Sequence, residues 1–169
     1  QEAINAAPNN TQTTIELLDN PSERISVNEN KNLILDLGTS TLSNSGDFRV
    51  IDNDGTLTII NGTITSNANQ GAINNNKGLL TIGNTQIIAT GSRQAVYIYD
   101  GTVEITTGAY LTSKTNGTPS GVTMERGTVQ CLADGELIIT GGTIIGEKQQ
   151  AVSNDGTLIK SKSGSVPGY

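Results

Sequence analysis

The sequence predicts an all-β protein, a parallel β-helix in which short strands stack on one another in successive coils. Three observations predict this fold: a repeat of about 23 residues, aliphatic residues two positions apart inside each repeat, and Gly, Asn and Asp between them. Only 3% of the residues are aromatic and Trp is absent, so the core has to be built from Ile, Leu and Val. About six or seven coils, or rungs, fit into the 169 residues.

The repeat is clearest after three equally spaced glycines, Gly55, Gly78 and Gly101. Each is followed by two aliphatic residues two positions apart, so both side chains point to the same face of a short strand. Stacked rungs bury these side chains together, and each contributes about 1.5–3 kcal/mol. The predicted columns are Leu57–Leu80–Val103, Ile59–Ile82–Ile105 and, upstream of the glycines, Val50–Ile73–Val96.

The register is ambiguous between Gly121 and Gly156. Residues 121–127 match residues 95–101 at an offset of 26, whereas Gly135 matches Gly101 at an offset of 34. Either one rung holds an extra hairpin, or a loop is inserted around Thr128–Asp134. A further loop is expected at Lys114–Ser120.

The pattern divides the chain into a capping segment, a β-helix and a tail or linker: 1–14, 15–160 and 161–169. A short helix is predicted over Glu2–Ala7, ending before Pro8 because the residue before a proline avoids helical angles. Ala3, Ile4 and Ala7 would lie on one side of that helix and cover the open first rung. Such caps protect edge strands from pairing with other molecules.

Over roughly residues 1–160 the chain resembles the pectate-lyase-like β-helix regions of Gram-positive bacterial surface proteins and adhesins. The resemblance is carried by Ile25-Ser26-Val27, by Lys31-Asn32-Leu33-Ile34-Leu35-Asp36-Leu37, by Thr41-Leu42 and by the Gly-Thr-Leu-Thr-Ile repeats after them. It implies a right-handed coil, the usual hand of parallel crossovers. The family includes polysaccharide lyases, galacturonases, phage tailspikes and non-enzymatic adhesins, so the resemblance indicates a fold and not an activity.

Composition excludes several classes of site. The net charge is −6 and no basic cluster occurs, so nucleic acid is not an expected partner. The chain has no histidine, which excludes His-based catalysis and the usual zinc sites within it. No apolar run reaches membrane-spanning length, so membrane insertion is not expected. The one cysteine, Cys131, is expected to fill a core position, and no cofactor is predicted.

Five aspartates lie within a few residues of a glycine: Asp52, Asp54, Asp100, Asp134 and Asp155. Paired carboxylates could hydrolyse a glycosidic bond or hold calcium for a lyase. Asp-Gly is also ordinary turn chemistry, and these acids recur at the turn position of the repeat. We therefore predict no catalytic residue and no metal site.

Two tyrosines form the candidate ligand-binding site. In Val96-Tyr97-Ile98-Tyr99 the aliphatic residues match inward columns, so both rings should point outward. A tyrosine can stack on a sugar ring while its hydroxyl hydrogen-bonds; alternatively, the rings only cover the sheet. Residues expected on the rungs to either side complete the candidate site: Asn74, Asn76, Thr123 and Glu125.

A second outward column is predicted at Thr65, Ile88, Leu111 and Ile145, where it would dock a partner or a neighbouring domain. The alternative is that one of these residues points inward in place of Tyr110. We favour the alternative.

These observations favour a non-enzymatic module of a secreted bacterial cell-surface protein, acting as an adhesin or a display domain and binding glycans or a surface protein. The signal peptide and the anchor are expected outside this chain. A polysaccharide lyase or glycoside hydrolase of the same fold is the second hypothesis, and a purely structural spacer is the third.

Overall fold

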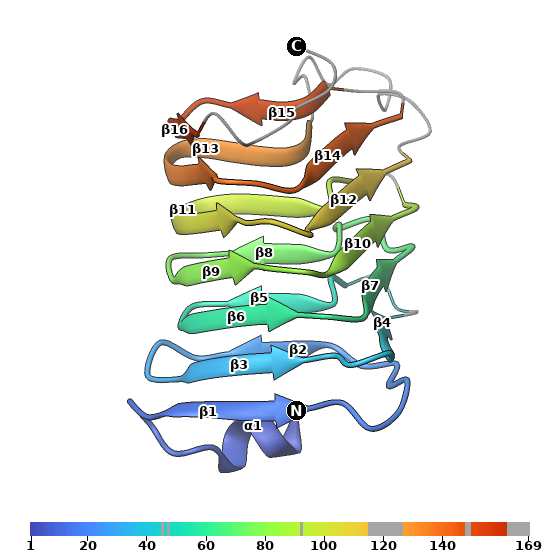
Figure 1. Ribbon diagram of the computed structural model, residues 1–169, viewed down its shortest axis with the longest axis vertical. Coiled ribbons are helices and arrows are strands. Elements are labelled where there is room, and N and C mark those ends of the chain that lie inside the picture. Colours follow the sequence, from blue (N-terminus) through green and yellow to red (C-terminus); the bar gives the residue numbers. More distant parts are fainter. Residues whose placement is uncertain (45, 47, 92, 115–126, 148–149, 162–169) are drawn as a thin grey trace.

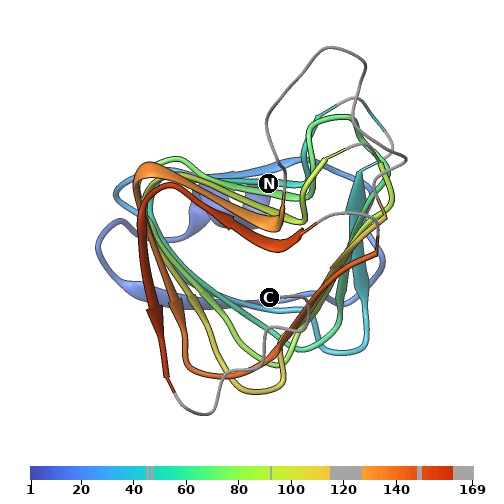
Figure 2. The ribbon, with the colours of Figure 1, turned by 90° about the horizontal axis from the view of Figure 1, so that it is seen from above.

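The computed structural model describes residues 1–169 apart from residues 45, 47, 92, 115–126, 148–149 and 162–169. The protein is a β-solenoid of about six turns, with a short helix at its N-terminal end (Figure 1). Seen along the axis, the turns overlay as roughly three-sided coils (Figure 2). The predicted parallel β-helix is confirmed.

The strands form three faces, and every pairing is parallel. Face 1 contains β2 (Ile25–Val27), β5 (Ile51–Asn53), β8 (Ile73–Asn75) and β15 (Gln150–Asn154). Face 2 contains β1 (Gln12–Glu16), β3 (Asn32–Asp36), β6 (Thr56–Ile60), β9 (Leu79–Ile82) and β16 (Thr157–Lys160). Face 3 contains β4 (Thr41–Asn44), β7 (Thr63–Ser66), β10 (Gln86–Ala89), β12 (Tyr110–Ser113) and β14 (Thr143–Gly146). Two long strands run through face 1 and then face 2: β11 (Val96–Ile105) and β13 (Gly127–Ile139).

The aliphatic columns lie in register along the axis. Leu57 pairs with Leu33 on one side and with Leu80 on the other, and the same column continues through Val103 to Leu137. None of these five side chains is more than 1% exposed. The second predicted column is also confirmed in register and buried: Ile59, Ile82 and Ile105.

The third predicted column is wrong by one residue at its start. Ile51, not Val50, pairs with Ile73, so the step between these rungs is one residue shorter than the predicted repeat. Val50 lies at the corner just before β5, where its N–H and that of Ile51 both donate to the carbonyl of Ala72. A constant step fails here because the connection from Ile51 to Leu57 is one residue shorter than the connection from Ile73 to Leu80.

The ambiguous C-terminal register is settled by the pairing of β11 with β13. Val96 pairs with Val129 and Ile98 with Cys131, so the interpretation of Thr128–Asp134 as a loop is wrong. Asp100 then pairs with Asp134, which leaves one extra residue in β13 at a bulge. The predicted loop at Lys114–Ser120 lies almost wholly outside the described residues.

The predicted outward column on face 3 is also corrected. Leu111 is fully buried and pairs with Ile87 and Ile144, while Tyr110 is 38% exposed. The inward residue of β12 is therefore Leu111. Thr112, and not Leu111, holds the predicted outward position beside Ile88. This is the alternative that the sequence favoured.

The N-terminal cap is the helix α1 (Glu2–Ala6), which places Ile4 and Ala7 against the core. Ala3 is exposed, contrary to the expectation that it covers the first rung. The Lys31 ammonium donates to the carbonyls of Asn5, at 3.2 Å, and of Ala7. Lys31 therefore satisfies carbonyl groups that a helix end leaves without partners. Within the described residues, no helix has the length and apolar character needed to cross a membrane.

An inward column of amides runs along face 1 beside the aliphatic core. Asn53 and Asn75 are fully buried in consecutive rungs, and Asn53 Nδ2 donates to Asn75 Oδ1 at 2.8 Å. Asn75 Nδ2 in turn donates to the carbonyls of Gly78 and Asp100, at 2.9 and 3.0 Å. The amides thus bind the backbone turn that leads from face 1 to face 2.

Candidate functional site

A continuous column of polar side chains covers the outer surface of face 1. The pairing register places these residues on successive rungs, about 4.8 Å apart: Ser26, Asp52, Asn74, Tyr97, Gln130 and Ser153. We call this set the polar column. Three of its members point away from the core and are nevertheless buried: Asp52, Asn74 and Gln130.

Asp52 is held between two arginines. Its carboxylate accepts a 2.7 Å hydrogen bond from Arg24 Nε and lies 2.6 Å from Arg24 Nη2. Arg49 Nε lies 3.3 Å from the other carboxylate oxygen but is not aimed at it as a hydrogen-bond donor. The Arg24 guanidinium also packs over the ring of Phe48, 5.3 Å from its centroid. The negative charge of this buried carboxylate is therefore balanced by neighbouring guanidinium groups, as expected for a buried acid.

A pocket of about 300 Å³ opens beside the polar column, where the loops from face 3 enter face 1. It is lined by Arg49, Gln70, Arg93, Gln94 and Tyr97. Tyr97 lies in β11, and the other four residues come from three successive loops, those after β4, β7 and β10. Arg49 Nη2 donates to Gln70 Oε1 at 3.1 Å, and Arg93 Nε donates to the Asn69 carbonyl at 2.9 Å. We call it the corner pocket.

Two buried acceptors at the corner pocket and beside it have no partner within the described part of the chain. Gln94 is 3% exposed, and its Oε1 accepts no hydrogen bond. Asn74, next to Tyr97 in register, donates to Asn76 Oδ1, but its own Oδ1 is unpaired. A buried acceptor without a partner costs free energy, and native structures rarely leave one without a reason. The arrangement therefore favours a ligand that carries hydroxyl or amide donors.

The predicted tyrosines occupy different surroundings. Tyr97 is half-buried and lines the corner pocket. Tyr99 is 60% exposed and lies where the β11–β13 register shifts, between Ile98 and Asp100. Asn74 is adjacent to Tyr97 as predicted, and Asn76 contacts Asn74.

Thr123 and Glu125 lie outside the described residues. The position expected for Thr123 beside Tyr97 is occupied by Gln130, because Val96 pairs with Val129 and the rung between them is longer than the repeat. Sequence reasoning missed Gln130 because it placed residues 121–127 on that rung.

Four lining residues of the corner pocket were also missed: Arg49, Gln70, Arg93 and Gln94. The available signal was weak. Gln70 and Arg93 are one full repeat apart, so polar residues at equivalent loop positions fall together. Aliphatic columns define the repeat, and a search limited to strands passes over the loops.

Of the other predicted aspartates, Asp54 and Asp155 lie in turns, whereas Asp100 and Asp134 lie in β11 and β13 beside the bulge. Asp100 accepts a hydrogen bond from the N–H of Gly101, and the Asp155 N–H donates to the Cys131 carbonyl. Among the described residues, no group of three or more His, Cys, Asp or Glu is placed to hold a metal ion. Cys131 fills a fully buried core position, and burial raises the pKa of its thiol.

Comparisons with family models, with curated proteins and with solved structures found no match for this chain. The resemblance to pectate-lyase-like β-helix regions therefore stays an expectation. The solenoid itself rests on the strand pairing described above.

Proposed function

We propose that this chain is a carbohydrate-binding module without catalytic activity, which acts in an adhesin or a display protein of the bacterial cell surface. The observation that carries the proposal is the corner pocket, where Gln94, whose buried Oε1 is unpaired, lies with Tyr97 and two arginines. A sugar hydroxyl donates to such an acceptor and accepts from a guanidinium. The apolar face of a sugar ring stacks on tyrosine.

The polar column extends this chemistry along the axis. Asn74 and Gln130 flank Tyr97 on neighbouring rungs, and each adds an amide. A polysaccharide chain lying along face 1 would cross successive rungs about 4.8 Å apart. This supports an oligomeric sugar ligand over a single sugar residue.

The display role is supported by the shape of the solenoid. The helix α1 and the strand β16 lie at opposite ends of the stack (Figure 1). A protein that contains this module would be lengthened along the solenoid axis. The cell-surface location comes from the resemblance and is part of the proposal.

The first test is binding to immobilised microbial and plant polysaccharides. Tyr97→Ala is expected to weaken binding at least tenfold, about 1.4 kcal/mol, because it removes the stacking ring. Gln94→Leu is expected to weaken it as well, since the acceptor is lost at nearly constant volume. Tyr110→Ala, an exposed tyrosine on face 3, is the matched control and should bind like the parent.

Circular dichroism and the thermal midpoint would confirm that each variant is folded. The proposal is wrong if the parent binds none of the polymers, or if Tyr97→Ala and Tyr110→Ala bind them equally well. A Tyr99→Ala arm determines whether the second tyrosine belongs to the site.

A lyase or hydrolase of the same fold is the alternative. The observation that favours it is the cluster of Asp52 with Arg24 and Arg49 on the outer surface of face 1. Unsaturated or shortened products from the same polymers, with or without calcium, would overturn the non-catalytic proposal if Asp52→Asn abolished them.

A further inference from the structure

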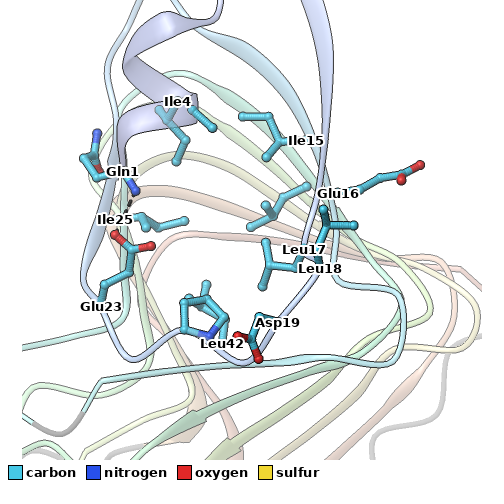
Figure 3. Close-up of a pocket in the computed structure, with 13 residues that line it drawn as sticks. Gln1, Ile4, Ile15, Glu16, Leu17, Leu18, Asp19, Glu23, Ile25 and Leu42 are labelled. Carbon is cyan, nitrogen blue, oxygen red and sulfur yellow. Dashed lines mark hydrogen bonds and ion pairs between the residues drawn. The ribbon is translucent and has the colours of Figure 1, made fainter.

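A second pocket lies at the N-terminal end of the solenoid, remote from the polar column. Its volume is about 320 Å³, and most of its lining is apolar, including Ala3, Ile4, Ile15, Pro21, Ile25 and Leu42. Figure 3 shows Ile4, Ile15 and Ile25 directed towards a common space between α1 and β1. Ligand pockets for small molecules have this size and character.

The hollow arises because one aliphatic column stops short. Residues 21–23, which precede β2, lie beside β4 and complete the hydrogen bonds at its edge. The Pro21 carbonyl accepts from the Ser43 N–H, and the Glu23 N–H donates to the Ser43 carbonyl. Ser22 bridges to Ser43, so the position beneath Leu42 falls to the small ring of Pro21. The edge backbone is therefore satisfied, while space that a longer aliphatic side chain would fill remains. The inward column on face 3 that ends here runs through Ile144, Leu111, Ile87, Ile64 and Leu42.

The surroundings of the pocket are acidic. The chain up to Glu23 contains four carboxylates and no Lys or Arg. Asp19 and Glu23 line the pocket together with Glu16, whose carboxylate points away from it (Figure 3). Glu23 contacts the amino group of Gln1 at 2.8 Å, whereas Asp19 accepts only the N–H of the next residue among the described contacts.

The first arginine and the first lysine of the sequence, Arg24 and Lys31, are engaged elsewhere. Lys31 donates to the carbonyls at the end of α1, and Arg24 pairs with Asp52. Neither is a lining residue of the pocket. The one cationic group among the lining residues, the amino group of Gln1, pairs with Glu23, so the remaining charge at the rim is negative and favours a cation over an anion.

We propose that this pocket binds the alkyl chain of a cationic amphiphile, with the ammonium group held at the rim by Asp19. The aliphatic lining packs against the alkyl chain, and the Asp19 carboxylate binds the ammonium group. The proposal is independent of the glycan site, since the two pockets share no residue.

The test measures binding of octylammonium, octanoate and 1-octanol to the whole chain at pH 7 by calorimetry, at concentrations below aggregation of each probe. Octylammonium is expected to bind at least about tenfold more tightly than octanoate, since the two share the chain and differ in the sign of the head group. Shortening the ammonium probe to hexylammonium should weaken binding about fourfold for each CH₂ removed.

Two variants locate the site. Ala3→Trp, at an exposed helix position that lines the pocket, should abolish octylammonium binding by filling the space. Asp19→Asn should reduce the preference for octylammonium over octanoate. Glu104→Gln, a carboxylate change on face 2 in β11, is the matched control and should leave both affinities unchanged.

Equal binding of octylammonium and octanoate would overturn the proposal. So would no binding by the parent, unchanged binding by a folded Ala3→Trp variant, or capture of a Lys-rich aliphatic peptide in place of octylammonium. Glycan binding by the same preparation would remain a separate result.

Discussion

At the scale of single residues, the inward amides of face 1 are the most specific feature of the fold. Asn53 Nδ2 donates to Asn75 Oδ1 and also to the Gly55 carbonyl, at 2.8 and 3.2 Å. Further along the same column Ile98 and Cys131 replace the amide. An aliphatic side chain therefore fits the space, and what an amide adds there is hydrogen bonding to the turn.

We expect Asn75→Leu to lower the free energy of unfolding by about 1–3 kcal/mol, because it removes one acceptor of the buried Asn53 amide and the amide donor of the Gly78 and Asp100 carbonyls. Urea denaturation monitored by circular dichroism measures the effect. Asn9→Leu, the same change at an exposed position, is the control. Equal midpoints for the two variants would mean that the amide column does not stabilise the turn.

At the scale of elements, the cap depends on one buried cation. Lys31 is 8% exposed, and its ammonium reaches the C-terminal carbonyls of α1 from the turn between β2 and β3. A helix of five residues has too few internal hydrogen bonds to be stable alone. The burial of Ile4 and the bonds from Lys31 therefore hold α1 over the first rung.

Lys31→Met keeps most of the side-chain volume and removes the donors. We expect faster amide hydrogen exchange at Asn5 and Ala7, whose N–H groups bond within the cap, and a cost of about 1–3 kcal/mol at the carbonyls left without partners. Mass-spectrometric exchange of the N-terminal peptide measures this. Lys77→Met, at an exposed ion pair with Glu29, should leave the exchange of α1 unchanged. Equal exchange rates in the two variants would mean that Lys31 does not stabilise the cap.

At the scale of the whole molecule, each rung contacts the rungs before and after it, so stability is shared between neighbours. Ile82 is fully buried between Ile59 and Ile105, whereas Leu158 in β16 has a neighbour in register, Leu137, on one side. A fault in the middle of the stack should therefore cost more than a fault at its end.

Ile82→Asn is expected to lower the free energy of unfolding by several kcal/mol, because it buries an amide among aliphatic side chains. Leu158→Asn, half-buried in the terminal rung, should lower it much less. Thermal and urea unfolding of both variants compare the two positions. A larger effect at Leu158 would contradict the view that the central rungs carry the stability.

The sequence predicted the columns of face 2 because the alternation within strands and the longer repeat between rungs coincide there. It misplaced Val50 and left the rung after Tyr97 ambiguous, because loop lengths shift the register and leave no aliphatic signal of their own. The corner pocket was not predicted for a related reason. Arg49, Gln70 and Arg93 meet only after three loops have been aligned in space, and loop residues carry no periodicity that fixes their direction.

The two turns that border face 1 differ in the freedom they leave to the chain. A side chain added at Gly78 would place its Cβ 1.9 Å from the Gly55 carbonyl oxygen, so this position admits no side chain, and the β11–β13 bulge lengthens the turn by a single residue. At the opposite turn, the rung from Val96 to Val129 is much longer than the rung from Ile73 to Val96, and the strands still pair in register. Segments can therefore be inserted or deleted at this turn, beside the corner pocket, without a change in the packing of the core. Sequence changes that alter which ligand the protein binds should concentrate there.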